Sequence, residues 1–253
     1  FGTVQFALPQ AAQVDQEKLY AYEVGAKTTW MDGALQANAA IYHYDYEERQ
    51  IGVTITDPVT FWPASGIVNA AEAETNGFEV DLTWSVTDAL TLAAAYAYTD
   101  AEWTDFNYTN IRAEAGGSVT PKDQAICGNA AGDCSGMDVA GIPEDALTLM
   151  ADYRMPVSDT LEGFINVIAA YQGERNVYDR VNTAVMDSYW NVDAQTGVQT
   201  DDWSLALFVN NLFDDDTPRW GQGYSHFRDG MYGGMGGQPR DVTVFAILPP
   251  PRL

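Results

Sequence analysis

Aromatic side chains that stand beside acidic residues are the part of this sequence best suited to binding a ligand. They gather in segments between the regular stretches of the chain. A flat ring can stack on a planar or sugar-like ligand, and its face can hold a cation. The same rings can also pack a loop against its own fold, and both interpretations stay open. The candidate substrate-binding set is Phe61, Trp62, Trp103, Phe106, Tyr108, Trp220, Tyr224, His226 and Tyr232.

Residue combinations that carry out covalent chemistry are missing from this sequence. The serine-nucleophile pattern G-x-S-x-G, the phosphate loop, the dinucleotide pattern G-x-G-x-x-G and the zinc pattern H-E-x-x-H do not occur. The two histidines, His43 and His226, lie far apart in the chain and do not form a catalytic set. We therefore predict no catalytic residues, no cofactor and no enzymatic activity.

The cysteines and the densest acidic run are the groups in this sequence that could bind a metal ion. Cys127 and Cys134 have six residues between them in a Gly-, Ala- and Asp-rich segment. Since other soft ligands are scarce there, this pattern favours a small disulfide in an oxidising compartment over a zinc site. Asp214, Asp215 and Asp216, with Asp229 nearby, offer oxygen ligands but lack the spacing of a calcium loop, so we predict no metal site.

Charge and hydropathy limit the class of protein. The net charge is −24, from 36 acidic and 12 basic residues, and such a chain would repel nucleic-acid phosphates. A hydrophobic content of 46% with 12% aromatic residues is that of a folded chain. No stretch approaches the roughly 18 apolar residues of a membrane-spanning helix, but a membrane-spanning strand needs only about 10 residues with every second one apolar.

Alternation of apolar and polar residues is the clearest local pattern, and it predicts β-strands with two different faces. Between residues 77 and 86, Phe78, Leu82 and Trp84 fall on one face while Glu79 and Asp81 fall on the other. A membrane barrel and a soluble β-sandwich both show such alternation. We predict about nine strands, at 19–30, 34–47, 67–85, 89–104, 146–155, 160–172, 184–194, 201–211 and 240–248.

The lengths of the predicted connections alternate between short and long, which is typical of an outer-membrane barrel with one trimmed end and one end bearing working loops. The short connections are 31–33, 86–88, 156–159 and a looser one at 196–197. The long, outer ones are about 48–66, 105–145, 173–181 and 214–239. Aromatic residues crowd the strand ends, as in a girdle at the lipid headgroups: Tyr20, Tyr22, Trp30, Tyr42, Tyr44, Tyr46, Tyr96, Tyr98 and Trp103.

Four strings resemble a known family, the TonB-dependent outer-membrane receptors. Residues 19–33 are similar to its S/AYE-x-G-x-K strand and following Asp-Gly turn, and residues 69–79 to its N-A-x-x-A-x-x-x-G-x-E strand entry. Residues 209–214 resemble its V-x-N-L-F-D element, and residues 238–240 the G-x-P-R before its last strand. The four strings occur in the family's order across nearly the whole chain.

This resemblance implies an all-β fold, namely a transmembrane antiparallel β-barrel of about 22 strands around a plugged lumen. Residues 1–253 would form the C-terminal part of that barrel domain. The plug domain and the TonB box would lie upstream of Phe1. The implied location is the outer membrane of a Gram-negative cell. The implied partners are outer-membrane lipid, the remainder of the barrel with its plug, and the TonB energy-transducing complex.

The resemblance further implies a receptor that binds a scarce solute at its extracellular loops and imports it through the barrel. A metal chelate, a corrinoid and a saccharide all remain open as the small-molecule substrate. Inward-facing Glu79, Asp81 and Glu162 would make the lumen wall acidic, which favours cationic solutes. The alternatives are a passive porin or structural barrel without a plug, and a secreted β-sandwich that binds carbohydrate through its aromatic loops.

The C-terminal end departs from the family pattern. Family members usually end on an aromatic residue, whereas this sequence ends with Pro249, Pro250, Pro251, Arg252 and Leu253. Because proline cannot donate a hydrogen bond to a strand ladder, we expect the last strand to end near Leu248.

Overall fold

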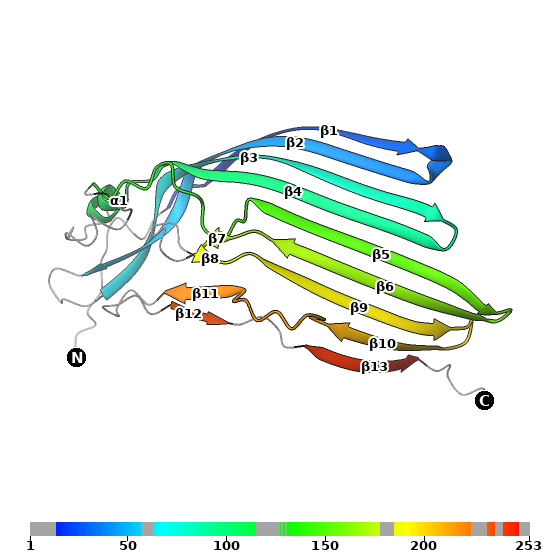
Figure 1. Ribbon diagram of the computed structural model, residues 1–253. Coiled ribbons are helices and arrows are strands. Elements are labelled where there is room, and N and C mark those ends of the chain that lie inside the picture. Colours follow the sequence, from blue (N-terminus) through cyan, green and yellow to red (C-terminus); the bar gives the residue numbers. More distant parts are fainter. Residues whose placement is uncertain are drawn as a thin grey trace, which may run out of the picture.

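One antiparallel sheet dominates the computed structural model, which describes residues 14–56, 63–114, 127, 129, 131–177, 185–223, 232–235 and 240–247 (Figure 1). Its nine strands run side by side in the order β1-β2-β3-β4-β5-β6-β9-β10-β13. They are β1 Lys18–Trp30, β2 Leu35–Thr56, β3 Pro63–Thr87, β4 Leu90–Asp105, β5 Asp145–Ser158, β6 Leu161–Gln172, β9 Tyr189–Gln199, β10 Ser204–Asn210 and β13 Asp241–Ile247. The nine strands of this sheet confirm the all-β prediction.

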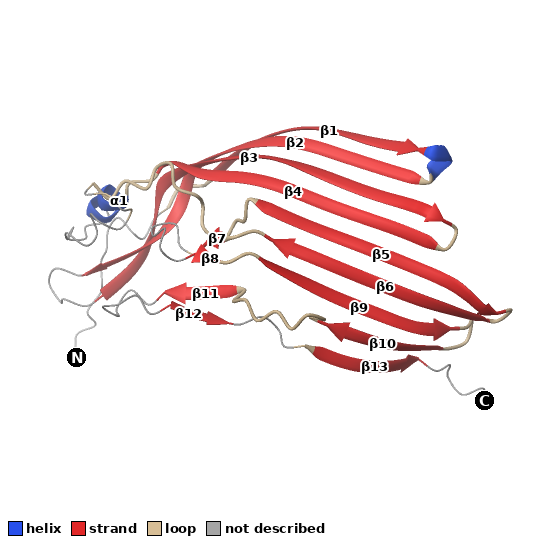
Figure 2. Ribbon diagram, in the orientation of Figure 1, coloured by secondary structure: helices blue, strands red, loops and turns tan. Residues whose placement is uncertain are grey.

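The remaining elements are small (Figure 2). Two hairpins pair β7 Arg175–Asn176 with β8 Val185–Met186, and β11 Trp220–Gly223 with β12 Tyr232–Met235. The helices are η1 Met31–Gly33 and α1 Tyr108–Glu114. Within the residues described, neither helix has the length and apolar character needed to cross a membrane.

The connections alternate in length along the chain, as the sequence predicts. Strands are joined at one end of the sheet by residues 31–34, 88–89, 159–160 and 200–203. The strand ends that flank the connections 57–62, 106–144, 173–188 and 211–240 are at the opposite end of the sheet, where α1 and both small hairpins also lie (Figure 1). The first short turn uses Asp32 and Gly33 at positive φ, a conformation that glycine adopts without strain. We call the end with the long connections the outer end.

Two of the predicted long connections have different bounds in the structure. The segment 48–66 is mostly strand, because β2 continues to Thr56 and β3 begins at Pro63. Its charged start is a β-bulge, where the register shifts between Tyr46 and Arg49 and Glu48 takes a positive φ. The bulge interrupts the alternation of apolar and polar residues, and for that reason the sequence pattern predicts a loop here. The connection expected at 173–181 extends to residue 188 and contains β7 and β8.

The turn predicted at 196–197 is wrong, and the strand predicted at 184–194 is β9 at residues 189–199. Gly197 lies inside β9, paired with Phe164 of β6 and Ala206 of β10. The Phe164 side chain is 8% exposed, and a Cβ added at Gly197 would stand 2.7 Å from its ring. Glycine here makes room for a ring on a neighbouring strand, which is one of the few uses of glycine inside a sheet.

The register gives the sheet one apolar and one polar face. Residues paired directly across strands share a face, so Leu82 lies in a row with Ala94, Leu149 and Ala169. On the other face Asp81 lies in a row with Asn38 and Lys27. We call these the outer face and the inner face.

No second layer covers the outer face in the part of the chain that the structure describes. Phe78, Leu82, Leu205 and Leu207 are 37%, 40%, 44% and 40% exposed. A β-sandwich would bury these residues between two sheets, so the sandwich alternative is wrong. A continuous apolar face of this kind suits contact with hydrocarbon.

The register also corrects the predicted aromatic girdle. Tyr20, Tyr22, Trp30, Tyr96 and Tyr98 share the outer face with Phe78 and Leu82. Tyr42, Tyr44, Tyr46 and Trp103 have the opposite parity and lie on the inner face. The Tyr42 ring covers Gly77 and its hydroxyl lies 2.8 Å from the Thr99 hydroxyl. Only the first of these two groups lies on the face where a headgroup girdle would form.

We predict that Gly197→Ala in the intact protein lowers its stability by about 2 kcal/mol, because the added methyl group clashes with the Leu205 carbonyl of β10 and overpacks the Phe164 ring. Thermal unfolding in detergent, followed by circular dichroism, measures the change. Gly52→Ala is the matched control, since a Cβ at Gly52 of β2 would meet nothing within 4 Å. Equal unfolding temperatures for the two variants would contradict the packing role of Gly197.

Candidate substrate-binding region at the outer end

The described residues of the connection between β4 and β5 form a cap with its own apolar core at the outer end. The core joins residues of β2, β3 and β4 to α1 and to the segment after it. Trp103 is 1% exposed, and Phe106 and Cys134 are fully buried. The buried members are Ile51, Ala71, Ala73, Ala101, Trp103, Phe106, Tyr108, Ile111, Cys134 and Val139.

Backbone hydrogen bonds fix the cap to the end of β4. The Trp103 N–H donates to the Met137 carbonyl at 2.9 Å, and the Gly136 N–H donates back to the Trp103 carbonyl at 2.7 Å. Further along, the Cys134 N–H donates to the Phe106 carbonyl at 2.7 Å. The returning segment therefore runs antiparallel to β4 and extends its ladder beyond the sheet.

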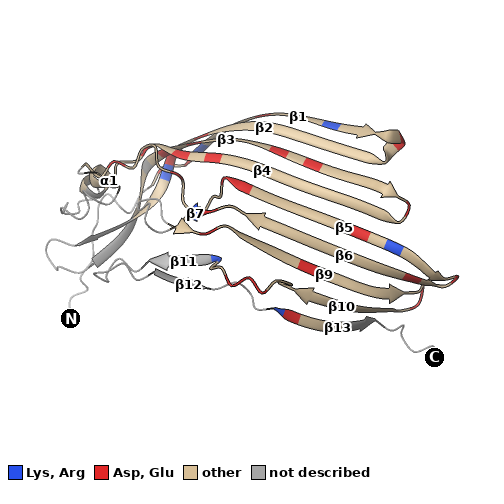
Figure 3. Cartoon of the chain, viewed as in Figure 1, with Lys and Arg blue, Asp and Glu red and all other residues tan. Residues whose placement is uncertain are grey.

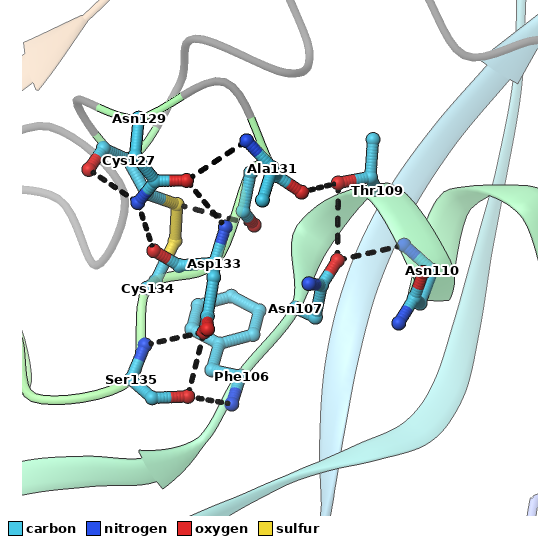
Figure 4. The surroundings of a disulfide bond; sticks show 11 residues. Phe106, Asn107, Thr109, Asn110, Cys127, Asn129, Ala131, Asp133, Cys134 and Ser135 are labelled. Carbon is cyan, nitrogen blue, oxygen red and sulfur yellow. Dashed lines mark hydrogen bonds between the residues drawn. A yellow bond between two sulfur atoms is a disulfide. The ribbon is translucent and has the colours of Figure 1, made fainter.

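A disulfide between Cys127 and Cys134 closes the turn of the cap (Figure 4). Asn129 spans the same turn and donates from Nδ2 to the Asp133 carbonyl at 2.6 Å. The Asp133 carboxylate accepts from the Ser135 hydroxyl at 2.7 Å and from the Ser135 N–H at 3.0 Å. These hydrogen bonds to the charged form lower the pKa of Asp133 below its usual value. The turn is thus closed by one covalent bond and several polar ones.

Three of the nine candidate aromatic residues lie in the cap core. Trp103, Phe106 and Tyr108 are buried, and the Arg49 guanidinium stacks 4.6 Å from the Trp103 ring centroid. Packing accounts for all three, since they present no surface to a ligand in this arrangement. Phe61, Trp62, Tyr224 and His226 lie outside the described residues. The backbones of Trp220 and Tyr232 lie in β11 and β12, so these six remain predicted ligand contacts.

The inner face carries the acidic residues expected there, but part of their charge is paired. Acidic residues recur along the strands and basic ones are sparse (Figure 3). The Arg154 guanidinium of β5 lies 3.0 Å from Asp152 and 3.1 Å from Glu162 of β6. Gln199 of β9 donates to the same Glu162 carboxylate at 2.7 Å. This network crosses three strands near the short turns, so Glu162 contributes less negative charge to the wall than Glu79 or Asp81.

The aspartates near residue 215 hold a turn. Asp214 accepts from the Arg240 N–H at 3.2 Å, and Asp215 accepts from the Thr217 N–H at 2.9 Å. Among the described residues, no group of three or more His, Cys, Asp or Glu side chains is placed to hold a metal ion.

A pocket of about 300 Å³ lies between the cap connection and the β7–β8 hairpin. Its lining comes from the ends of β4, β5 and β6 and from both connections, so no single stretch of sequence could have revealed it. Five carboxylates contribute to its wall: Asp100, Asp138, Glu144, Asp145 and Glu174.

Two arginines that sequence reasoning missed meet near this pocket. Arg175 begins β7, Arg219 directly precedes β11, and both guanidinium groups lie against the Tyr189 ring at the start of β9. The only sequence signal for them is the scarcity of basic residues, 12 among 253. The two arginines come close because β6 pairs with β9. The predicted bounds of β9 were wrong, so the sequence did not indicate this pairing.

We predict that removing the disulfide with the Cys127→Ser and Cys134→Ser double variant loosens the cap while the sheet stays intact. Closing a loop this short is worth about 2 kcal/mol. Hydrogen exchange should therefore speed up at the backbone amides of position 134 and of Gly136, which donate to the Phe106 and Trp103 carbonyls. The β5–β6 amides serve as the internal control. Unchanged exchange at the cap amides would show that its core suffices without the disulfide.

Comparison with known proteins places this architecture in a family. The family model described as TonB dependent receptor-like, beta-barrel matches residues 3–212. The probable TonB-dependent siderophore receptor PiuA of Acinetobacter baumannii is 27% identical over 202 residues, covering 79% of this chain and 24% of that protein. The metal-pseudopaline receptor CntO of Pseudomonas aeruginosa is 27% identical over 207 residues, with the same two coverages. The chain spans about a quarter of the length of these curated relatives.

Solved structures share the fold. The siderophore receptor PiuA from Acinetobacter baumannii superposes with a TM-score of 0.67 at 23% identity, covering 94% of this chain and 29% of that one. The ferric yersiniabactin uptake receptor FyuA from Yersinia pestis gives 0.66 at 15% identity, covering 91% and 29%. The ferric-catecholate import receptor Fiu from E. coli gives 0.61 at 20% identity, covering 92% and 28%. The family match confirms the resemblance seen in the sequence strings: this chain belongs to the TonB-dependent receptor β-barrel family, whose members are transport receptors of the outer membrane.

Proposed function

We propose that this chain forms the C-terminal part of an outer-membrane receptor that binds a metal chelate at its outer end and imports it through the barrel with energy from TonB. The observation that carries the proposal is the family match over residues 3–212. The two-faced sheet with short turns at one end and long connections at the other supports it.

The sheet edges support the view that the chain is part of a larger barrel. Within the described residues, β1 and β13 are the outermost strands and each pairs on one side only. In hydrocarbon an unpaired backbone N–H or C=O costs several kcal/mol, so a membrane sheet must close on itself. Further strands of the same receptor would pair with both edges, and its plug domain would occupy the space that the inner face surrounds.

The choice of a metal chelate as substrate rests on the relatives. Those with a printed substrate are receptors for a siderophore or metal-pseudopaline, and the similar solved structures include ferric-catecholate and ferric yersiniabactin receptors. Among the three solute classes left open by the sequence, these relatives favour a metal chelate over a corrinoid or a saccharide. The long connections at the outer end are the proposed place of capture.

Import, and not catalysis, is the proposed activity of the whole receptor. The cap is a compact unit on the inner face at the outer end, where it would narrow the entrance of the barrel. A narrowed, plugged barrel cannot pass a solute by diffusion alone, so transport would depend on an energy-transducing partner. A passive porin would show no such dependence.

We predict that the intact receptor confers TonB-dependent iron uptake on a Gram-negative host that lacks its own chelate receptors. Radiolabelled iron(III) is supplied as a catecholate chelate and as a citrate chelate, and cell-associated label is counted with time. Uptake of at least one chelate should exceed that of cells with the empty vector, and should vanish in a host without TonB.

Two outcomes would contradict the proposal. Uptake that persists unchanged without TonB indicates the passive porin. A receptor that is present in the outer membrane but takes up neither chelate is inconsistent with import of the proposed substrate class. Immunoblotting of purified outer membranes distinguishes that result from failed assembly.

A further inference from the structure

We propose that Arg175 and Arg219 form an anion-binding site at the outer end of the inner face, and that it takes an oxyanion such as a carboxylate carried by the metal chelate. The assignment of the anion to a chelate rests on the proposed function. The existence of the anion site rests on the contacts described below and can be tested separately.

The two arginines come from separate outer connections and meet over one ring. The Cζ atom of Arg219 lies 4.7 Å from the Tyr189 ring centroid, and that of Arg175 lies 6.0 Å from it. Arg175 Nη2 donates to the backbone carbonyl of Arg219 at 2.7 Å, which joins the connection 173–188 to the connection 211–240. Tyr189 pairs with Gln172 and donates its hydroxyl proton to the Gln172 amide oxygen at 2.6 Å. The ring is thereby held in place beneath both cations.

The cluster lies on the inner face. Tyr189 and Asn191 alternate with Trp190, whose ring packs against Tyr171 on the outer face. Arg219 Nη2 donates to the Asn191 amide oxygen at 3.1 Å. A solute that enters the lumen from outside would therefore pass this cluster near the beginning of its path.

Among the residues that the structure describes, the partners of both guanidinium groups are neutral. They are a backbone carbonyl, an amide oxygen and an aromatic face. Within the described residues, no carboxylate comes close enough to pair with either arginine, although Glu174 is the neighbour of Arg175 in sequence. Arg154 at the other end of the sheet shows the usual arrangement, with two carboxylates beside it. The absence of pairing is notable in a chain with three acidic residues for each basic one.

Two donor atoms of the pair are buried, although each arginine as a whole is partly exposed. Among the described residues, Arg175 Nη1 and Arg219 Nε have no hydrogen-bond acceptor. A buried guanidinium N–H without an acceptor is unfavourable, and two like charges at one ring add mutual repulsion. One anion that accepts hydrogen bonds from both groups would remove both costs. Guanidinium groups are suited to this role, because their planar N–H groups match the two oxygens of a carboxylate.

The acidic pocket nearby sharpens the selectivity. Arg175 contributes to its wall beside Glu174, while Asp138 accepts a hydrogen bond from Asn176 at 3.0 Å. The carboxylates weaken the binding of a simple anion such as chloride, which makes few hydrogen bonds. An anion that accepts hydrogen bonds from both guanidinium groups can still bind, because those bonds offset the repulsion. The site is therefore expected to prefer a carboxylate-bearing solute such as citrate to chloride.

The test measures anion binding on the intact receptor in detergent. Thermal unfolding is followed in sodium citrate and in sodium chloride at equal ionic strength. Binding to the folded state raises the unfolding temperature, so citrate should raise it in the wild type. The Arg175→Gln/Arg219→Gln double variant should lose the citrate-specific increase, with an apparent Kd at least about tenfold higher. Arg240→Gln, which removes one exposed cation at the start of β13, should keep it.

A wild-type receptor without a citrate-specific increase, or a double variant that retains it, overturns the anion site whatever the transport assay shows. If the glutamine variants do not assemble, Arg175→Lys/Arg219→Lys keeps the charge and removes the planar fork. Its apparent Kd for citrate should lie above the wild-type value, and an unchanged Kd overturns the proposed fork geometry.

Uptake of the iron(III) chelates then separates the two proposals. Wild-type receptor that binds citrate but imports no chelate leaves the anion site standing and contradicts the proposed function. Import that proceeds equally in the wild type and in an assembled glutamine variant contradicts the assignment of the site to the chelate.

Discussion

The constraint on which this structure depends is the pairing of backbone hydrogen-bonding groups across an unbroken antiparallel ladder. Outside water, a strand can satisfy its N–H and C=O groups only on its neighbours, so each strand in the membrane must be paired along both edges. The eight antiparallel pairings of the nine-stranded sheet follow from this requirement. Side chains are then distributed by the two-residue period of the strands, apolar ones outward and polar ones inward. The candidate binding groups lie on the inner face or at the outer end.

The outer end carries a second apolar core, of the kind found in water-soluble domains, at the end of a membrane sheet. The cap buries Trp103 and Phe106 among side chains from β2, β3 and α1, as a small soluble domain would. This core needs little of the sheet beyond the ends of three strands. Its disulfide compensates for its small size, since a core of so few residues gains limited stability from burial alone. The sheet and the cap are thus stabilised by different interactions.

Sequence reasoning predicted the sheet well because its signals are local. Alternation and turn residues lie within a few positions of each other, and they located the Asp32-Gly33 turn and the strand around Phe78 closely. It failed where a residue's role is decided by another strand. Glycine is typical of turns, but Gly197 lies inside β9, where it pairs with Phe164 of β6 and leaves room for the Phe164 ring. The Arg49 bulge likewise resembled a loop because its charges interrupt the pattern.

The site was harder to predict for the same reason. From the sequence alone, Trp103 and Phe106 could equally contact a ligand or pack in a core. Only the fold shows that they are buried. Arg175 and Arg219 are 44 residues apart and meet through the pairing of β6 with β9 and β9 with β10. No window along the sequence contains both. The pocket beside them is assembled from five segments and has no local signal at all.

The contact of Tyr42 with Gly77 has a consequence for assembly. A strand that slides by two residues keeps its apolar face outward, so hydrophobicity alone does not reject that misalignment. The Tyr42 ring, however, fits only where the facing residue has no side chain, and the positions two residues away from Gly77 on β3 are Thr75 and Glu79. A slipped β2–β3 hairpin would press the ring against one of them. Gly77 therefore favours one register of β2 against β3 while the barrel assembles.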